Sequence, residues 1–127
     1  MAKKQIATPN APSAIGPYSQ AVEAGNMVFV SGQIALDPQS GEVVPGNIEV
    51  QAKRIMESLR MILMEAGCEF NNVVKSNIYL TDLNDFAKVN EIYGSYFKEP
   101  YPARATVEVS SLPKGVALEI DVIAVKD

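Results

Sequence analysis

The segment from residue 48 to residue 66 constrains the fold most, because apolar side chains recur in it at steps of four and three. The stripe consists of Ile48, Ala52, Ile55, Leu59, Ile62 and Ala66. This spacing predicts an amphipathic α-helix whose apolar face must pack against another layer. Asn47 is the expected N-cap, and Gly67 suits the position just after the helix.

Segments with strand patterns precede and follow this helix in the sequence. The apolar runs 18–24 and 27–31 are joined by Gly25-Asn26, a spacer typical of a β-hairpin. Further strands are expected at residues 73–80, 105–109 and 117–125. In the last of these, alternate residues share one apolar face, namely Leu118, Ile120, Val122 and Ala124.

A second helix is expected after a cap at Asp82 or Asn84, ending at Pro100 and Pro102. The order β-β-α-β-α-β-β predicts an α+β fold: a single domain over residues 1–127, with a mixed sheet and both helices on one face. The other face keeps apolar residues such as Ile123. An exposed apolar face of this size is unusual in a monomer, so we expect a closed oligomer, whose subunit number the pattern does not give.

The composition excludes many kinds of site. The 127 residues contain no histidine, which removes serine–histidine triads, cysteine–histidine dyads and almost every zinc site. The single cysteine, Cys68, cannot form an intrachain disulfide, and a cytoplasmic location is the expectation. The net charge of −4 argues against a protein that grips nucleic acid. No apolar run is long enough to span a membrane.

Arg104 and Glu119 are the two candidates for chemistry. Arg104 begins a strand after two prolines, and its planar guanidinium could bind a carboxylate through two hydrogen bonds. An ordinary surface arginine is the alternative. Glu119 lies within an apolar strand, where burial would raise its pKa and suit it to acid–base work. Alternatively, Glu119 is a carboxylate at the rim of a solvated or interfacial face. Asp121 lies on the same face and fits the pattern equally well.

Four further residues are weaker candidates. Ser31 and Gly32 end a strand, and a glycine there lets a ligand approach the backbone. Asn90 interrupts the apolar side of the second helix and needs a hydrogen-bonding partner. Tyr18 follows Gly16-Pro17 at the start of the first strand. Taken one at a time, each is better explained by a structural role.

Several segments together resemble the Rid (YjgF) family, in its order and spacing across essentially the whole chain. They are residues 15–20 (IGPYSQ), 30–34 (VSGQI), 84–90 (NDFAKVN), 102–107 (PARATV) and 118–120 (LEI). The nearest resemblance is to the RidA type, the reactive-intermediate imine deaminases. It implies a chorismate-mutase-like homotrimer whose sheets form a central barrel, with active sites between adjacent subunits.

The resemblance also implies hydrolysis of 2-iminopropanoate and 2-iminobutanoate to 2-keto acids and ammonia, with no metal or other cofactor. Arg104 would bind the substrate carboxylate, and Glu119 would activate water. The pocket would be lined by Tyr18, Ser31, Gly32, Asn90 and the backbone near Thr106. Many RidA proteins have a cysteine where this chain has Thr106. We expect only the backbone to be used there, so that activity persists.

Two other functions stay open. A non-catalytic module that binds small carboxylates needs only Arg104. Ribonuclease activity or translation inhibition is also associated with the family, but the charge of −4 and the lack of histidine disfavour it.

Overall fold

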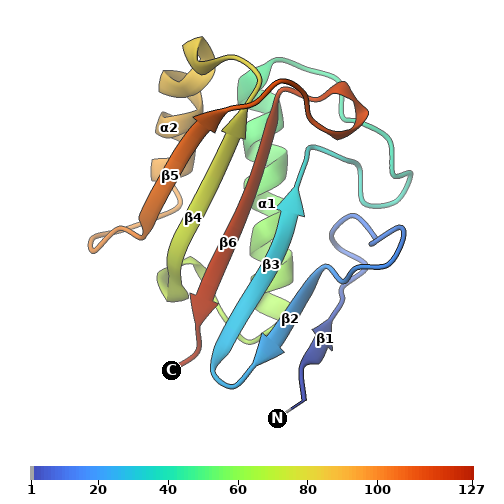
Figure 1. Cartoon of the computed structure of the whole chain (residues 1–127), viewed down its shortest axis with the longest axis vertical. Coiled ribbons are helices and arrows are strands. Elements are labelled where there is room, and N and C mark those ends of the chain that lie inside the picture. The colour runs from blue at the N-terminus through green and yellow to red at the C-terminus, as the bar shows by residue number, and fades with distance from the viewer. Residues whose placement is uncertain (1) are drawn as a thin grey trace.

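Two helices cover one face of a mixed six-stranded sheet in the computed structural model, which describes residues 2–127 (Figure 1). The strands are β1 (Lys4–Ile6), β2 (Ala21–Ala24), β3 (Met27–Gln33), β4 (Val73–Leu80), β5 (Ala103–Glu108) and β6 (Leu118–Val125). The helices are α1 (Ile48–Glu65) and α2 (Phe86–Gly94), with 3₁₀ turns η1 (Phe70–Asn72), η2 (Leu83–Asp85) and η3 (Pro113–Gly115). The strand order is β1-β2-β3-β6-β4-β5, and only β4 and β5 are parallel. The predicted fold class is confirmed.

Helix α1 forms as its sequence predicts. The Asn47 side chain accepts a hydrogen bond from the Val50 backbone N–H at 3.0 Å, which satisfies one free donor of the first turn. Gly67 follows the helix with a φ of +79°, a conformation that costs glycine little. The apolar stripe packs on β3 and β6, where Leu59 and Ile120 are fully buried. Each such side chain contributes about 1.5–3 kcal/mol to stability.

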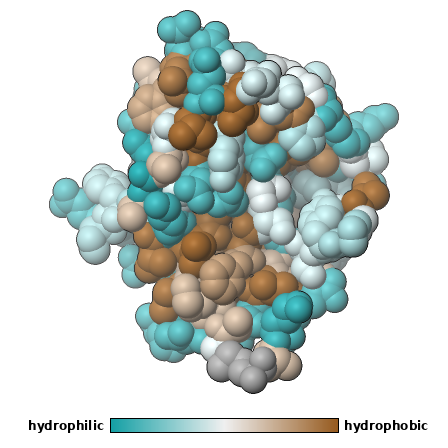
Figure 2. Space-filling view, in the orientation of Figure 1, coloured by the Kyte–Doolittle hydropathy of each residue, from teal (hydrophilic) through white to brown (hydrophobic). Residues whose placement is uncertain are grey.

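The opposite face of the sheet carries no helix among the described residues. Alternation along β6 buries four apolar side chains under α1 and turns the other four to this open face. Phe29 of β3 and Val107 of β5 remain 38% and 44% exposed. Figure 2 views this face and shows apolar surface gathered over its lower part, beside polar surface. An apolar open face was expected from the sequence and is present.

The N-terminal part differs from the prediction in two ways. Strand β1, which pairs with β2, was not expected, because three residues show no readable alternation. The strand expected at 18–24 begins only at Ala21. The Tyr18 N–H donates to the Gly16 carbonyl in a turn, and the Gln20 side chain turns inward to the preceding loop.

The second helix and β5 also have different bounds. Asp82 caps η2 rather than α2, because its side chain accepts from the Asn84 N–H at 2.9 Å. Helix α2 ends at Gly94, well before the prolines that were expected to stop it. Phe97 nevertheless stays in the core, with its ring centroid 4.7 Å from that of Tyr93. Strand β5 runs two residues further toward the N-terminus than expected and ends one residue earlier.

Cys68 is free and buried just after α1, and desolvation raises the pKa of its thiol. Among the described residues, no three cysteine, aspartate or glutamate side chains gather to hold a metal ion. Over residues 2–127, none of the helices has both the length and the apolar character needed to cross a membrane.

Candidate functional site

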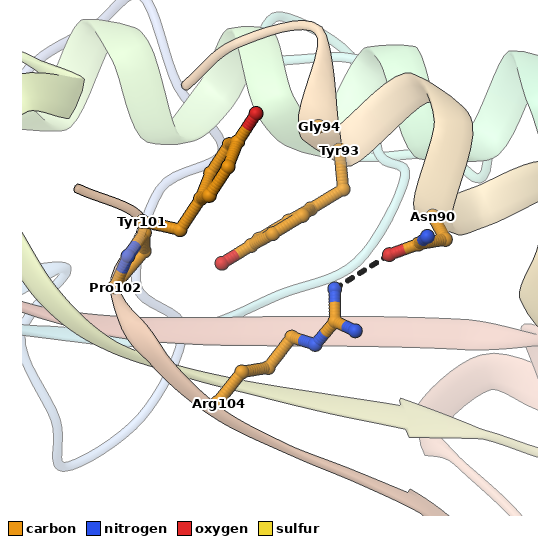
Figure 3. Close-up of a pocket in the computed structure, with 6 residues that line it drawn as sticks. All are labelled: Asn90, Tyr93, Gly94, Tyr101, Pro102 and Arg104. Atoms are coloured by element: carbon orange, nitrogen blue, oxygen red, sulfur yellow. Dashed lines mark hydrogen bonds between the residues drawn. The ribbon is translucent and has the colours of Figure 1, made fainter. Parts of the chain in front are cut away.

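Arg104 lies on the edge strand β5, and its side chain extends toward α2. One guanidinium nitrogen, Nη1, donates a hydrogen bond to Oδ1 of Asn90 at 2.6 Å (Figure 3). The guanidinium carbon lies 5.1 Å from the ring centroid of Phe86 and 5.2 Å from that of Tyr93. These cation–π contacts and the amide orient the planar fork, whose other N–H groups suit a carboxylate.

A cleft of about 450 Å³ surrounds this guanidinium. It is lined by Asn90, Tyr93, Gly94, Tyr101, Pro102 and Arg104. The Tyr93 ring stands beside the arginine, and the Tyr101 ring lies on the far side of Tyr93 (Figure 3). The Tyr93 hydroxyl donates to Oγ of Ser76 at 2.8 Å, and burial raises the pKa of Tyr93. Tyr93 is therefore an anchored, neutral wall of the cleft.

Glu119 lies in a second cavity of about 640 Å³, formed by strand ends and loops. The residues that line it include four of the sequence candidates, Tyr18, Ser31, Gly32 and Glu119. Its apolar lining includes Ile15, Ile34 and Leu36. Burial, and after it the negative charge of Asp121, raises the pKa of Glu119. A carboxylate with a raised pKa is a stronger base, as acid–base work requires.

Gly32 on β3 lets the carboxylate come close to the backbone. A Cβ at this position would lie 2.8 Å from Cδ of Glu119, closer than carbon atoms approach. Its φ is not in the left-handed region, so the requirement for glycine here is one of space. The absence of a Cβ thus leaves room for the Glu119 side chain of the same chain, whereas the approach of a ligand to this backbone stays a prediction.

The loop before β2 forms one wall of the Glu119 cavity and is tied to β2 by Gln20. The buried Gln20 amide donates to the carbonyl oxygens of Thr8, Ala11 and Pro12 at 3.1, 3.2 and 2.7 Å. Its Oε1 accepts from the Thr8 N–H at 2.7 Å. Tyr18, at the end of this loop, is 53% exposed at the cavity. Tyr18 is thus a loop residue and does not begin the strand, as the sequence had led us to expect.

The two cavities open on opposite faces of the sheet. Arg104 is paired in register with Ser76, whose hydroxyl contacts Tyr93 of α2, so its side chain lies on the helix face. Glu119 is paired with Tyr79 and lies between the buried Leu118 and Ile120, so its side chain lies on the open face. One chain therefore has two separate cavities and does not bring its own Arg104 and Glu119 together.

Thr106 lies on β5, two residues after Arg104 and on the same face, half-buried and paired with Ile78. It does not line the arginine cleft. Several lining residues were not among the sequence candidates, and Tyr101 and Lys114 are two of them. Tyr101 could have been found by its place beside Pro102 and Arg104, whereas Lys114 lies in the turn η3, with a φ of +58°, and no local pattern placed that turn at the Glu119 cavity.

Residues 8–126 match the family model described as "Endoribonuclease L-PSP". A RutC family protein of Pyrococcus abyssi is 56% identical, covering 100% of both chains. A 2-iminobutanoate/2-iminopropanoate deaminase of Mus musculus is 52% identical, covering 98% of this chain and 92% of its own. The crystal structure of E. coli TdcF with bound serine superposes with a TM-score of 0.92 at 46% identity, covering 98% of this chain and 99% of the other.

Proposed function

The chain belongs to the endoribonuclease L-PSP (YjgF/Rid) family, and from that premise we propose that it hydrolyses 2-imino acids to 2-keto acids and ammonia. The substrates are 2-iminopropanoate and 2-iminobutanoate, in line with the name of the mouse relative at 52% identity. The serine bound to TdcF supports a site suited to small amino-acid-like carboxylates.

The observation that carries the proposal is the division of the candidate residues between two half-sites. Asn90 and Arg104 line one cleft, and Tyr18, Gly32 and Glu119 line the other, on opposite faces of the sheet. In the proposed homotrimer, the arginine cleft of one subunit meets the glutamate cavity of the next. The apolar open face supports this assembly, because a closed oligomer would bury it.

In this site Arg104 binds the substrate carboxylate through two parallel hydrogen bonds, in an orientation set by Asn90. Tyr18 and the backbone at Ser31 and Gly32 border the imine group. The protonated imine of the substrate is already electrophilic. Once the substrate is bound in a fixed orientation, the protein has little further chemistry to supply.

The Glu119 carboxylate performs the proton transfers. It accepts a proton from water as the water oxygen bonds to the imine carbon, and the C=N electron pair moves to nitrogen. The carbinolamine nitrogen then takes the proton back from Glu119. The Glu119 carboxylate accepts the hydroxyl proton as the C=O bond forms and the C–N bond breaks, which releases the keto acid and ammonia. Ammonia then takes this proton from Glu119, so the balance is one protonated imine and one water to one ketone and one ammonium ion.

A coupled assay tests this function. A threonine dehydratase supplies 2-iminobutanoate, and the rate of keto-acid formation from the imine is followed with and without the protein. We expect acceleration by the wild type and none by Arg104→Ala. Equal rates with wild type, with Arg104→Ala and without protein would rule out the deaminase.

Two other candidate functions are each supported by a specific observation. The family description favours a ribonuclease, although the charge of −4 does not favour binding to RNA. The bound serine of TdcF is equally compatible with a non-catalytic module that binds small carboxylates. Keto-acid binding by calorimetry without imine turnover would favour that module. A cytoplasmic location and independence from cofactors remain predictions.

A further inference from the structure

Asp121 lies two residues after Glu119 on β6, so both carboxylates stand on the open face of the sheet. Side chains two residues apart along a strand are separated by roughly 7 Å. At this separation a charge in a partly desolvated site acts strongly on its neighbour. Asp121 does not line either cavity, so the proposed reaction has so far given it no part.

Two side chains of β4 hold the Asp121 carboxylate in place. The Asn77 amide donates to Oδ1 at 2.9 Å, and the Tyr79 hydroxyl donates to Oδ2 at 3.0 Å. Asn77 is directly opposite Asp121 in the register, whereas Tyr79 is opposite Glu119 and reaches diagonally to Asp121. Each carboxylate oxygen therefore has its own donor, an arrangement that suits an ionised, acceptor-only group.

The other groups around Glu119 are accounted for as follows. Strand β3 contributes Ser31 and Gly32, which carry no charge, and β4 contributes Tyr79. The loops contribute Tyr18 and the exposed Lys114 to the same cavity. Within this described set, Asp121 is the one carboxylate that faces Glu119, and its charge adds to burial in raising the pKa of Glu119.

We propose that Asp121 is a positioning residue for catalysis: held by Asn77 and Tyr79, it is a stationary negative charge that keeps Glu119 a stronger base than an isolated glutamate. The inference rests on the proposed role of Glu119 in the reaction. Asp121 touches neither substrate nor water and acts only through Glu119.

The test compares Asp121→Asn with two control variants. Asparagine keeps the size and a hydrogen-bonding group for each partner but removes the charge. Tyr79→Phe removes one hydrogen bond and leaves the charge. Glu65→Gln makes the same change in net charge at an exposed residue of α1, on the other side of the sheet.

Two readouts follow Glu119. Carbon-13 NMR of labelled glutamate carboxyls, assigned with Glu119→Gln, gives its titration without any turnover. The pH profile of kcat/KM gives the titration of the base in the reaction. We expect Asp121→Asn to lower the pKa of Glu119, to move the acid limb of the profile toward lower pH and to reduce the rate at neutral pH. Glu65→Gln should leave both titrations near those of the wild type. Tyr79→Phe, which keeps the charge and the Asn77 hydrogen bond, should shift them less than Asp121→Asn does.

An unchanged Glu119 titration in folded Asp121→Asn would overturn the inference, as would an equal shift in Tyr79→Phe, which would indicate a merely structural role. If Asp121→Asn does not fold, Asp121→Ser, which is also uncharged and smaller, takes its place. Failure of the proposed function would be a separate result. If the wild type does not turn over imines, NMR still measures whether the charge of Asp121 affects the titration of Glu119.

Discussion

At the scale of single residues, the Arg104 guanidinium depends on the planar shape that lets it contact Asn90, Phe86 and Tyr93 at once. Arg104→Lys keeps the charge but loses this fork, so we expect KM and the Kd for a keto acid to rise at least tenfold, the effect of about 1.4 kcal/mol. Calorimetry and steady-state kinetics measure the two quantities. Arg60→Lys is the matched control, because Arg60 also lies over two aromatic rings, at 5.7 and 5.4 Å, outside both half-sites.

Glu119 should affect the chemical step instead. Glu119→Gln keeps the shape but removes the base, so we expect turnover to fall about 10²–10⁴-fold with keto-acid binding nearly unchanged. Since the pKa of Glu119 is raised, the wild-type rate should increase with pH through a limb above the ordinary pKa of glutamate, because only the ionised form accepts a proton. A folded Glu119→Gln protein with wild-type turnover would remove Glu119 from the mechanism.

At the scale of elements, the loop before β2 depends on one buried side chain. Gln20→Leu removes the hydrogen bonds to Thr8, Ala11 and Pro12, and each buried group left unpaired costs about 1–3 kcal/mol. We expect faster hydrogen exchange in residues 8–18 and lower activity, with the helices still protected. Gln39→Leu, in an exposed turn, is the control. Unchanged exchange in Gln20→Leu would show that the loop is held by other contacts.

At the scale of the whole molecule, each proposed active site takes Arg104 from one subunit and Glu119 from the next. Mixing Arg104→Ala chains with Glu119→Gln chains and reassembling them should therefore restore activity in about a quarter of the sites, by random association in a cyclic trimer. Turnover of the mixture measures this, and sedimentation measures the assembly. A chain with both substitutions, mixed with either single variant, should restore nothing. A stable monomer of 13.7 kDa, or no recovery on mixing, would contradict the shared site.

The sequence by itself determined the features that depend on neighbours along the chain. The stripe from Ile48 to Ala66, the Asn47 cap and the alternation of β6 follow from local periodicity, and all three agree with the structure. Arg104 and Glu119 stood out for a similar reason, since each has unusual flanking residues. Whether they act as proposed is left to the variants above.

Only the tertiary structure decided which of these residues share a face. Pairing of Arg104 with Ser76 and of Glu119 with Tyr79 sets the two side chains on opposite sides of the sheet. Such register joins strands distant in sequence, so no local pattern encodes it. Contacts between distant segments also decide three other features. They are the pairing of strand β1, the inward orientation of the Gln20 side chain and the hydrogen bonds from β4 to Asp121. These contacts divide the candidate residues into two halves, which is why the proposed site needs a second copy of the chain.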